Sequence, residues 1–252
     1  MKENKYDDPQ FFEKYSHMAR SAQGLEGAGE WYALQKMLPD FSGKRVLDLG
    51  CGYGWHCRYA ARQGAARVLG LDLSEKMLER ARQMTQEPNI HYCRRAIEDI
   101  DFPPASFDLV LSSLAFHYIA DYPALCRKVE QCLAPGGDFV FSVEHPVFTA
   151  YGNQDWYYGS QGEILHWPVD HYYEEGRRQA VFLGEPVTKY HRTVTTYVQT
   201  LLQLGFVITG LVEPQPTPEA VEQIPGMADE MRRPMMLLVA AHKPAGGRQT
   251  KG

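Results

Sequence analysis

A run of apolar residues followed by three closely spaced glycines, VLDLGCGYG at residues 46–54, constrains this chain more than any other segment. Glycine accepts the left-handed backbone that most residues avoid, and it lets a ligand lie against bare amides at the start of a helix. Roughly 20 residues later Asp72 ends a second apolar run, where nucleotide-binding sheets use an acidic group to accept hydrogen bonds from ribose. The pattern predicts a strand, a turn and a helix that bind a nucleoside-containing ligand.

Beyond residue 44, short apolar runs alternate with amphipathic stretches, a pattern typical of βα units around a mainly parallel sheet. It predicts strands at residues 45–50, 67–72, 90–94, 107–112 and 138–143, and helices at 55–64, 74–84 and 122–133. A helix at 193–204 then precedes strands at 206–212 and 235–242. Because no helical crossover separates these last two strands, we expect them to pair antiparallel.

The length of the chain suits one domain over residues 1–252. Residues 144–190 lack periodicity and contain Trp156, Trp167 and several tyrosines, which is usual for a lid or binding loop. The predicted parts are an N-terminal helical cap (1–43, with helices at 9–23 and 25–38), a core (44–143), the lid (144–190) and a C-terminal helix with two strands (191–243).

The charge and composition exclude several classes of protein. The net charge is −5 and there is no basic run, so a nucleic-acid partner is not expected. The sequence contains neither a secretion signal nor an apolar stretch long enough to span a membrane, which favours the cytoplasm. The five cysteines form no CxxC pair, so we expect reduced thiols and no metal site.

The glycine-rich turn does not fit a nicotinamide dinucleotide. That fingerprint requires a third glycine three positions after the second, and this chain has Trp55 there. An acidic residue, Asp48, also precedes the glycines. An NAD-linked oxidoreductase is therefore the least favoured interpretation.

Five segments together resemble the class I S-adenosylmethionine-dependent methyltransferases, and most closely the methyltransferase type 11 group. The segments are VLDLGCGYG, GLDLS, AIEDI, FDLVLSSLAFHYI and LAPGGDFVFSVEHP, and the resemblance covers roughly residues 44–146 continuously. The resemblance implies a Rossmann-like, seven-stranded α/β sheet with helices on both faces and a lid inserted after strand five. The implied strand order is 3-2-1-4-5-7-6, with strand seven antiparallel.

The resemblance also implies which residues bind S-adenosylmethionine. The first motif would hold the methionine end of the cofactor, and Asp72 with its neighbour Leu73 would hold the ribose. Members of the family often have Asp where this chain has Ala96, so Glu98, Asp99 or the backbone must bind the adenine amino group. Met77 is either a core residue or an adenine contact. The full implied set is Tyr15, Met18, Arg20, Asp48, Gly50, Cys51, Gly52, Gly54, Asp72, Leu73, Met77, Ala96, Ile97, Glu98, Ser113, Leu114 and His117.

Methyl transfer from a sulfonium is an in-line displacement, so the protein must orient the reactants and exclude water. An acidic acceptor also needs a general base, and an unperturbed histidine titrates near neutral pH. We expect His145 or His191 to be this base, although His145 could simply cap a strand. Glu144, Tyr190 and Arg192 are candidate substrate contacts, and lid packing is the alternative for the last two.

The leading hypothesis is thus a methyltransferase acting on a small molecule, as a monomer or homodimer. A nucleic-acid methyltransferase is the first alternative. The acidic net charge argues against it, and so does SSLAFH at residues 112–117, which replaces an Asn/Asp-Pro-Pro-Tyr or Pro-Cys catalytic motif. A non-catalytic cofactor-binding module is the second alternative, and the intact glycine turn argues against it.

Overall fold

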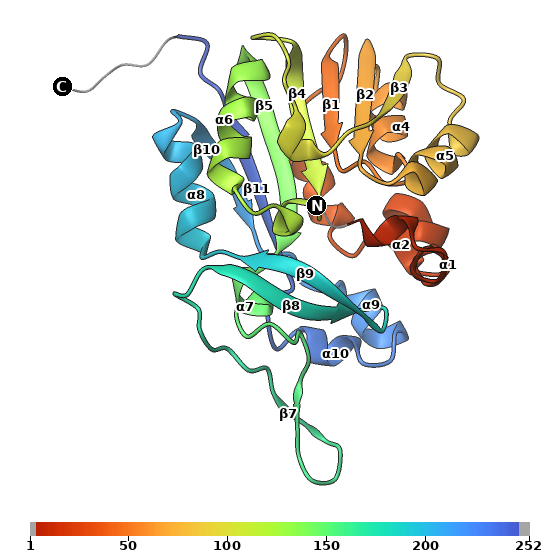
Figure 1. The fold of residues 1–252 in the computed structure, drawn as a ribbon, viewed down its shortest axis with the longest axis vertical. Coiled ribbons are helices and arrows are strands. Elements are labelled where there is room, and N and C mark those ends of the chain that lie inside the picture. Colours follow the sequence, from red (N-terminus) through yellow and green to blue (C-terminus); the bar gives the residue numbers. More distant parts are fainter. Residues whose placement is uncertain (1–3, 247–252) are drawn as a thin grey trace, which may run out of the picture.

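A seven-stranded sheet forms the centre of the computed structural model, which describes residues 4–246 (Figure 1). The strand order β10-β11-β5-β4-β1-β2-β3 confirms the predicted order, because β10 and β11 are the sixth and seventh strands of the sheet. Strand β11 runs antiparallel to both β5 and β10, and the other neighbours pair parallel. The strands of this sheet are β1 (Arg45–Leu49), β2 (Arg67–Asp72), β3 (Ile90–Arg94), β4 (Phe107–Ser113), β5 (Leu133–Glu144), β10 (Val207–Val212) and β11 (Met236–His242).

Helices cover both faces of the sheet, which explains why its central strands are almost continuously apolar. One face packs against α3 (Trp31–Met37), α4 (Trp55–Arg62) and α5 (Glu75–Met84), and the other packs against α6 (Tyr122–Cys132) and α8 (Val194–Gln203). Polar N-caps begin three of these helices: Ser74, Asp121 and Thr193 each accept a hydrogen bond from a backbone amide three residues on. The sequence therefore fixes these helix starts locally.

Strand β5 begins earlier than predicted. We expected a turn at Pro135-Gly136-Gly137, but the strand includes these residues. Leu133 already pairs with Phe107 of β4, and the register then shifts before Asp138 pairs with Leu109. The amide of Gly136 also donates to the carbonyl of Lys243, so the segment stays within the sheet.

The N-terminal segment is more broken than the two predicted helices. It consists of η1 (Lys5–Asp7), α1 (Pro9–Ser16), α2 (Ala19–Ala22), η2 (Gly24–Gly27) and then α3. Gly24 has a φ of +70° and lies so close to Trp55 that an added Cβ would be 2.8 Å from the indole. The left-handed glycine ends α2 and turns the chain over the glycine-rich turn, next to α4.

The prediction that residues 144–190 are irregular was wrong. After α7 (Pro146–Thr149), the lid contains the short pair β6 (Tyr157–Tyr158) and β7 (Ile164–His166), and then a long antiparallel hairpin, β8 (Gly176–Phe182) with β9 (Glu185–His191). Both strands alternate in burial, but in β8 the charged Arg178 lies on the less exposed side and the apolar Val181 on the exposed side, so the sequence of β8 carries a weak strand signal. In Figure 1 the hairpin lies below the carboxyl ends of the central strands.

Two short helices, α9 (Pro218–Gln223) and α10 (Met227–Glu230), lie between β10 and β11, where we predicted no element. Two 3₁₀ turns, η3 (Ile97–Asp99) and η4 (Phe116–Tyr118), follow β3 and β4. None of the helices within residues 4–246 is long and apolar enough to cross a membrane.

Candidate active site

The glycine-rich turn leaves open space beside its backbone. Gly50 and Gly52 both have left-handed backbone, with φ values of +77° and +51°. A Cβ added to Gly50 would lie 2.6 Å from the Cβ of Ala115, whereas one added to Gly52 would meet no atom within 4 Å. Gly52 lines a cavity, so a side chain there would occupy the space that a ligand needs. The predicted role of the turn thus has a local steric basis.

Asp72 connects this turn to the end of β2. Its Oδ2 accepts a hydrogen bond from the amide of Gly52, and its Oδ1 accepts one from the amide of Ser74, both at 2.9 Å. Each carboxylate oxygen has a second lone pair, so both can still accept a hydrogen bond from a neighbouring hydroxyl. Asp72 lines the same cavity as Gly52. This geometry suits recognition of two adjacent ribose hydroxyls.

Asp48 lies beneath the turn and not in the cavity wall. The thiol of Cys57 donates to its Oδ2 at 3.1 Å, and its Oδ1 has no hydrogen-bond partner among the described residues. Burial raises the pKa of Asp48 to about 7. A direct contact between Asp48 and the cofactor, which we expected, does not fit this placement. Cys51 and Gly54 also lie outside the cavity wall.

The cavity has a volume of about 1960 Å³ and extends from the glycine-rich turn to the lid and the loops around α9 and α10. We call the part near Gly52 and Asp72 the cofactor end, and the part near Glu144 and the lid the acceptor end. Most predicted site residues lie in its wall. They are Tyr15, Met18, Arg20, Gly50, Gly52, Asp72, Leu73, Met77, Ala96, Ile97, Glu98, Ser113, Leu114, His117, Glu144 and Tyr190.

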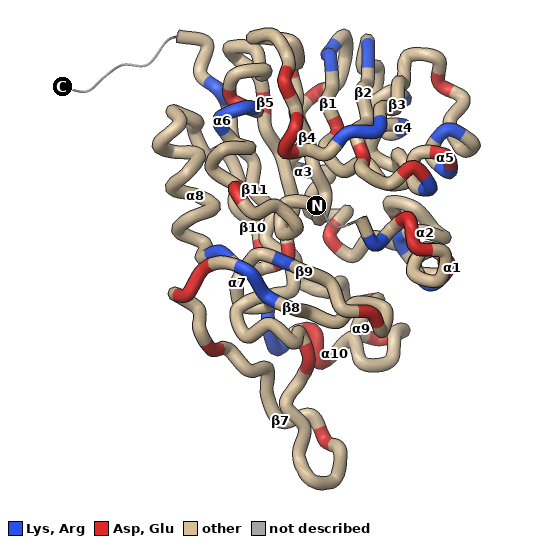
Figure 2. The backbone as a smooth tube through the Cα atoms, in the orientation of Figure 1, with Lys and Arg blue, Asp and Glu red and all other residues tan. Residues whose placement is uncertain are grey.

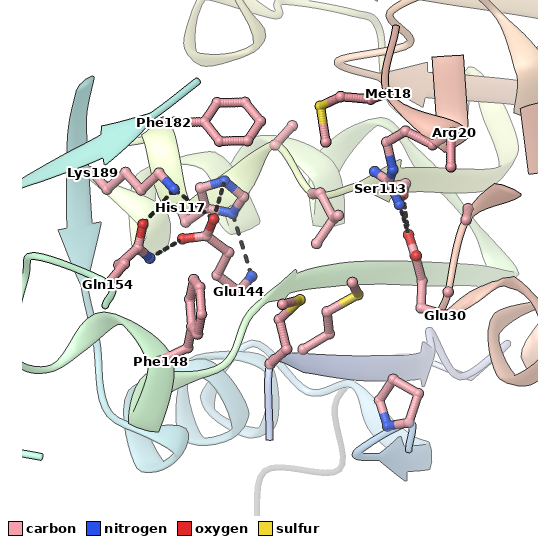
Figure 3. A pocket seen from close by; sticks show the side chains of 18 of the residues that line it. Met18, Arg20, Glu30, Ser113, His117, Glu144, Phe148, Gln154, Phe182 and Lys189 are labelled. Atoms are coloured by element: carbon pink, nitrogen blue, oxygen red, sulfur yellow. Dashed lines mark hydrogen bonds and ion pairs between the residues drawn. The ribbon is translucent and has the colours of Figure 1, made fainter. Parts of the chain in front are cut away.

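An ion pair from the N-terminal segment borders the cofactor end. The guanidinium of Arg20 lies 2.5 Å from Oε1 of Glu30, and the hydroxyl of Ser113 donates to the same oxygen at 3.2 Å (Figure 3). Glu30 is only 1% exposed. The sequence analysis missed this residue, although a glutamate amid the small and apolar residues of 27–34 was an available signal.

A second polar cluster borders the acceptor end. The ammonium of Lys189, from β9, donates to Oε1 of Glu144 at 2.5 Å and to Oε1 of Gln154 at 2.7 Å, and the Gln154 amide donates to Oε2 of Glu144 at 2.6 Å. His117 lies on the other side, with its Nε2 3.9 Å from Oε1 of Glu144 (Figure 3). Neither Lys189 nor Gln154 was predicted, because the lid brings them to Glu144 only in the folded chain.

Burial and neighbouring charges determine the protonation of this cluster. Burial alone would raise the pKa of Glu144, but His117, Lys189 and Gln154 together lower it below its ordinary value. Burial lowers the pKa of His117 to about 4. At neutral pH the cluster therefore contains an ionised carboxylate beside an uncharged imidazole, and Phe148 and Phe182 lie close to it in the cavity wall (Figure 3).

His145 and His191, which we expected to act as bases, lie outside the cavity wall. His145 caps α7: its Nδ1 accepts from the amide of Val147, and its Nε2 lies 2.7 Å from Glu213. His191 bonds to the Thr149 hydroxyl through Nδ1 and to a backbone carbonyl through Nε2. Burial lowers the pKa of both imidazoles. Their placement fits positioning of the lid and not contact with an acceptor.

Arg192 is also buried away from the cavity. Its guanidinium donates to the backbone carbonyls of Phe116, Ile119 and Ala120, and so joins the end of β9 to the segment around η4. The contact between Arg192 and the substrate that we expected therefore does not fit.

Among the described residues, no group of three or more His, Cys, Asp or Glu side chains could hold a metal ion.

The loop before β11 closes the acceptor end from the other side. The guanidinium of Arg233 lies over the rings of Phe148, Trp156 and Trp167, at 4.7, 5.1 and 4.2 Å from their centroids. Its Nη1 also lies 2.7 Å from Glu230. Arg233 therefore joins the C-terminal loop to the lid, a contact that spacing along the chain could not predict.

The strand order, the antiparallel β11 and the glycine-rich turn define a Rossmann-like fold of the class I methyltransferase type. A family model described as a methyltransferase domain matches residues 47–141. A solved structure from Listeria monocytogenes, assigned to the S-adenosylmethionine-dependent methyltransferases, is 59% identical. It covers 87% of this chain and 99% of its own, with a TM-score of 0.83.

Another S-adenosylmethionine-dependent methyltransferase, from Mesorhizobium loti, is 47% identical, covers 87% of this chain and 100% of its own, and has a TM-score of 0.80. An uncharacterized protein of Haemophilus influenzae is 33% identical over 94% of this chain and 96% of its own. The chain therefore belongs to the S-adenosylmethionine-dependent methyltransferases, and S-adenosylmethionine is its cofactor. The free space at Gly52 and the two accepting oxygens of Asp72 fit this ligand.

Proposed function

We propose that the protein methylates a small molecule bound at the acceptor end of the cavity. The observation that carries this proposal is the continuity of one cavity from Gly52 and Asp72 to Glu144 and Lys189. A cofactor bound at the turn and an acceptor beside Glu144 would share this space. Residues of the lid and of the C-terminal loop complete its wall, which favours an enclosed small molecule over a polymer.

S-adenosylmethionine, when bound, supplies an electrophilic methyl group. Gly52 and Asp72 would fix the nucleoside, and the segment after β4 would border the reacting centre. Glu144 is the ionised group of the acceptor-end cluster, so we assign it to accept a hydrogen bond from a hydroxyl or amine of the acceptor. Lys189 and Gln154 would hold that carboxylate in one orientation. The main contribution of these residues is then orientation.

A nucleic-acid acceptor is less well supported. In Figure 2, the lysine and arginine positions are interspersed along the backbone with acidic ones, and the net charge of the chain is −5. A cluster of basic side chains would be needed to neutralise several phosphates. A non-catalytic role is also less well supported, because the glycine-rich turn and Asp72 retain the arrangement that cofactor binding requires. We further expect the protein to be a cytoplasmic monomer or homodimer. The five cysteines are all free thiols.

Calorimetric titration with S-adenosylmethionine, S-adenosylhomocysteine and NAD would test the cofactor site first. We expect saturable binding of the two adenosyl ligands, none of NAD, and a large loss of affinity in Asp72→Ala. A screen of small-molecule pools with radiolabelled cofactor should then reveal a methylated product, and Glu144→Gln should lower its rate while cofactor affinity stays unchanged. Cofactor binding together with methylation of RNA or DNA and of no small molecule would contradict the proposed acceptor class.

A further inference from the structure

Glu30 combines burial, charge and an unused hydrogen-bonding position. It is the N-cap residue of α3, and its side chain is 1% exposed. Its Oε1 contacts Arg20 and Ser113, but its Oε2 has no hydrogen-bond partner among the described residues. Buried carboxylate oxygens are normally satisfied, and leaving one without a donor is costly. Oε2 of Glu30 can therefore accept a hydrogen bond from a bound ligand.

The surroundings of Glu30 keep it ionised. Burial alone would raise the pKa of Glu30, but the positive charge and hydrogen bond of Arg20 lower it below its ordinary value. The ion pair with Glu30 engages one of the five N–H groups that a guanidinium carries, so Arg20 retains donors for a second anion. Both residues line the cavity together with Gly50 and Ser113. The cofactor end is thus bordered by an adjacent anion and cation.

We propose that Glu30 binds the α-ammonium group of the cofactor while Arg20 binds its α-carboxylate. An amino acid is a zwitterion, and an Arg–Glu pair presents the opposite charge to each of its two ionic groups. An ammonium has three N–H donors, and one of them would satisfy Oε2 of Glu30. The pair would select ligands that carry the whole amino-acid group over other adenosyl thioethers. This inference concerns the cofactor and is independent of the acceptor.

Three ligands separate this role from a purely structural one. They are S-adenosylhomocysteine, its desamino analogue, which retains the carboxylate, and 5′-methylthioadenosine, which lacks the whole amino-acid group. Each would be titrated by calorimetry into the wild type, Glu30→Gln and Glu13→Gln. Glu13 is an exposed glutamate of α1 and provides a control with the same change of charge.

We expect Glu30→Gln to lower the affinity for S-adenosylhomocysteine roughly 10- to 100-fold, the usual range for losing one charge-assisted hydrogen bond. Its affinity for the desamino analogue and for 5′-methylthioadenosine should stay within about twofold of the wild-type values, a shift too small to represent a lost hydrogen bond. Glu13→Gln should resemble the wild type with all three ligands.

Two results would overturn the proposal. Equal losses for S-adenosylhomocysteine and its desamino analogue would show that Glu30 acts only by positioning Arg20. An unchanged affinity for S-adenosylhomocysteine would show that Glu30 does not contact the cofactor. If Glu30→Gln also fails to bind 5′-methylthioadenosine, the shorter carboxylate in Glu30→Asp provides the same comparison, and there too only a loss selective for the amino-bearing ligand supports the proposal.

Discussion

At the scale of single residues, the sequence predicted the positions whose role depends only on residues nearby in the chain. A left-handed glycine at Gly52 and an acid at the end of β2 can be inferred from a few neighbouring residues, and the structure places both in the cavity wall. The catalytic roles of His145 and His191 could not be judged in this way. Whether a side chain faces a cavity or a neighbouring loop depends on contacts such as that between His145 and the distant Glu213.

Asp48 should make folding stability depend on pH. Burial raises its pKa to about 7 from an ordinary value of 3.8. Between these values the folded state retains a proton that the unfolded state has lost, so the free energy of unfolding should fall as pH rises. The contribution of Asp48 to this slope is on the order of 1.4 kcal/mol per pH unit. The buried imidazoles of His56 and His117, whose pKa is lowered to about 4, add slopes of opposite sign below about pH 6.5. Urea denaturation should therefore show the Asp48 contribution as the difference between the slope of the wild type and that of Asp48→Asn, with the wild-type slope the more negative.

Asp108→Asn is the matched control for this experiment. A hydrogen bond from Arg45 lowers the pKa of Asp108, so this carboxyl group titrates below the same pH range. Its substitution should shift stability by a constant amount and leave the slope unchanged. A slope that is identical in the wild type and in Asp48→Asn would contradict the assignment to Asp48.

At the scale of elements, prediction succeeded where the strand is a short apolar or β-branched run within the alternating βα pattern, and failed where a strand mixes charged and apolar residues. Strands β1 to β4 and the β10–β11 pair lie within a few residues of their predicted bounds. The β8–β9 hairpin was missed because its first strand, GRRQAVF at 176–182, mixes charged and apolar residues and does not place the apolar ones on one face. Nothing local indicates that Lys189 of β9 becomes 2% exposed beside Glu144.

This buried ion pair should stabilise the hairpin against the end of β5. Lys189→Met leaves the carboxylate of Glu144 without its charged partner, and breaking such a pair typically costs about 3 kcal/mol. Urea denaturation should show this loss in the single variant and a clear recovery in the Lys189→Met/Glu144→Gln double variant, which removes both charges. A double variant that is less stable than the single one would indicate that the pair contributes little through its charges.

At the scale of the whole molecule, the alternation of βα units predicted the sheet and its order, because a small number of rules govern parallel connections. The path of the N-terminal segment over the turn was expected only from the family resemblance. The structure brings Arg20 and Glu30 to the wall that also contains Gly50 and Ser113, so two distant parts of the chain border one ligand site.

Cofactor binding should therefore protect both parts at once. S-adenosylhomocysteine at about 100 times its Kd should stabilise the fold by about 2.7 kcal/mol. In hydrogen-exchange mass spectrometry, peptides that contain α2 should gain protection together with those that contain the glycine-rich turn. The same measurement with 5′-methylthioadenosine, at an equal degree of saturation, provides the comparison for the amino-acid group. Protection limited to the core would show that the N-terminal segment takes no part in binding.

The wall of the acceptor end comes largely from two stretches of chain outside the central strands. One lies between β5 and α8, the other lies between β10 and β11, and Arg233 connects them over Trp167. Such stretches can change in length and sequence while the strand register and the turn that holds the nucleoside stay the same. Relatives can thus diverge in what they methylate without losing the way in which they hold the methyl donor.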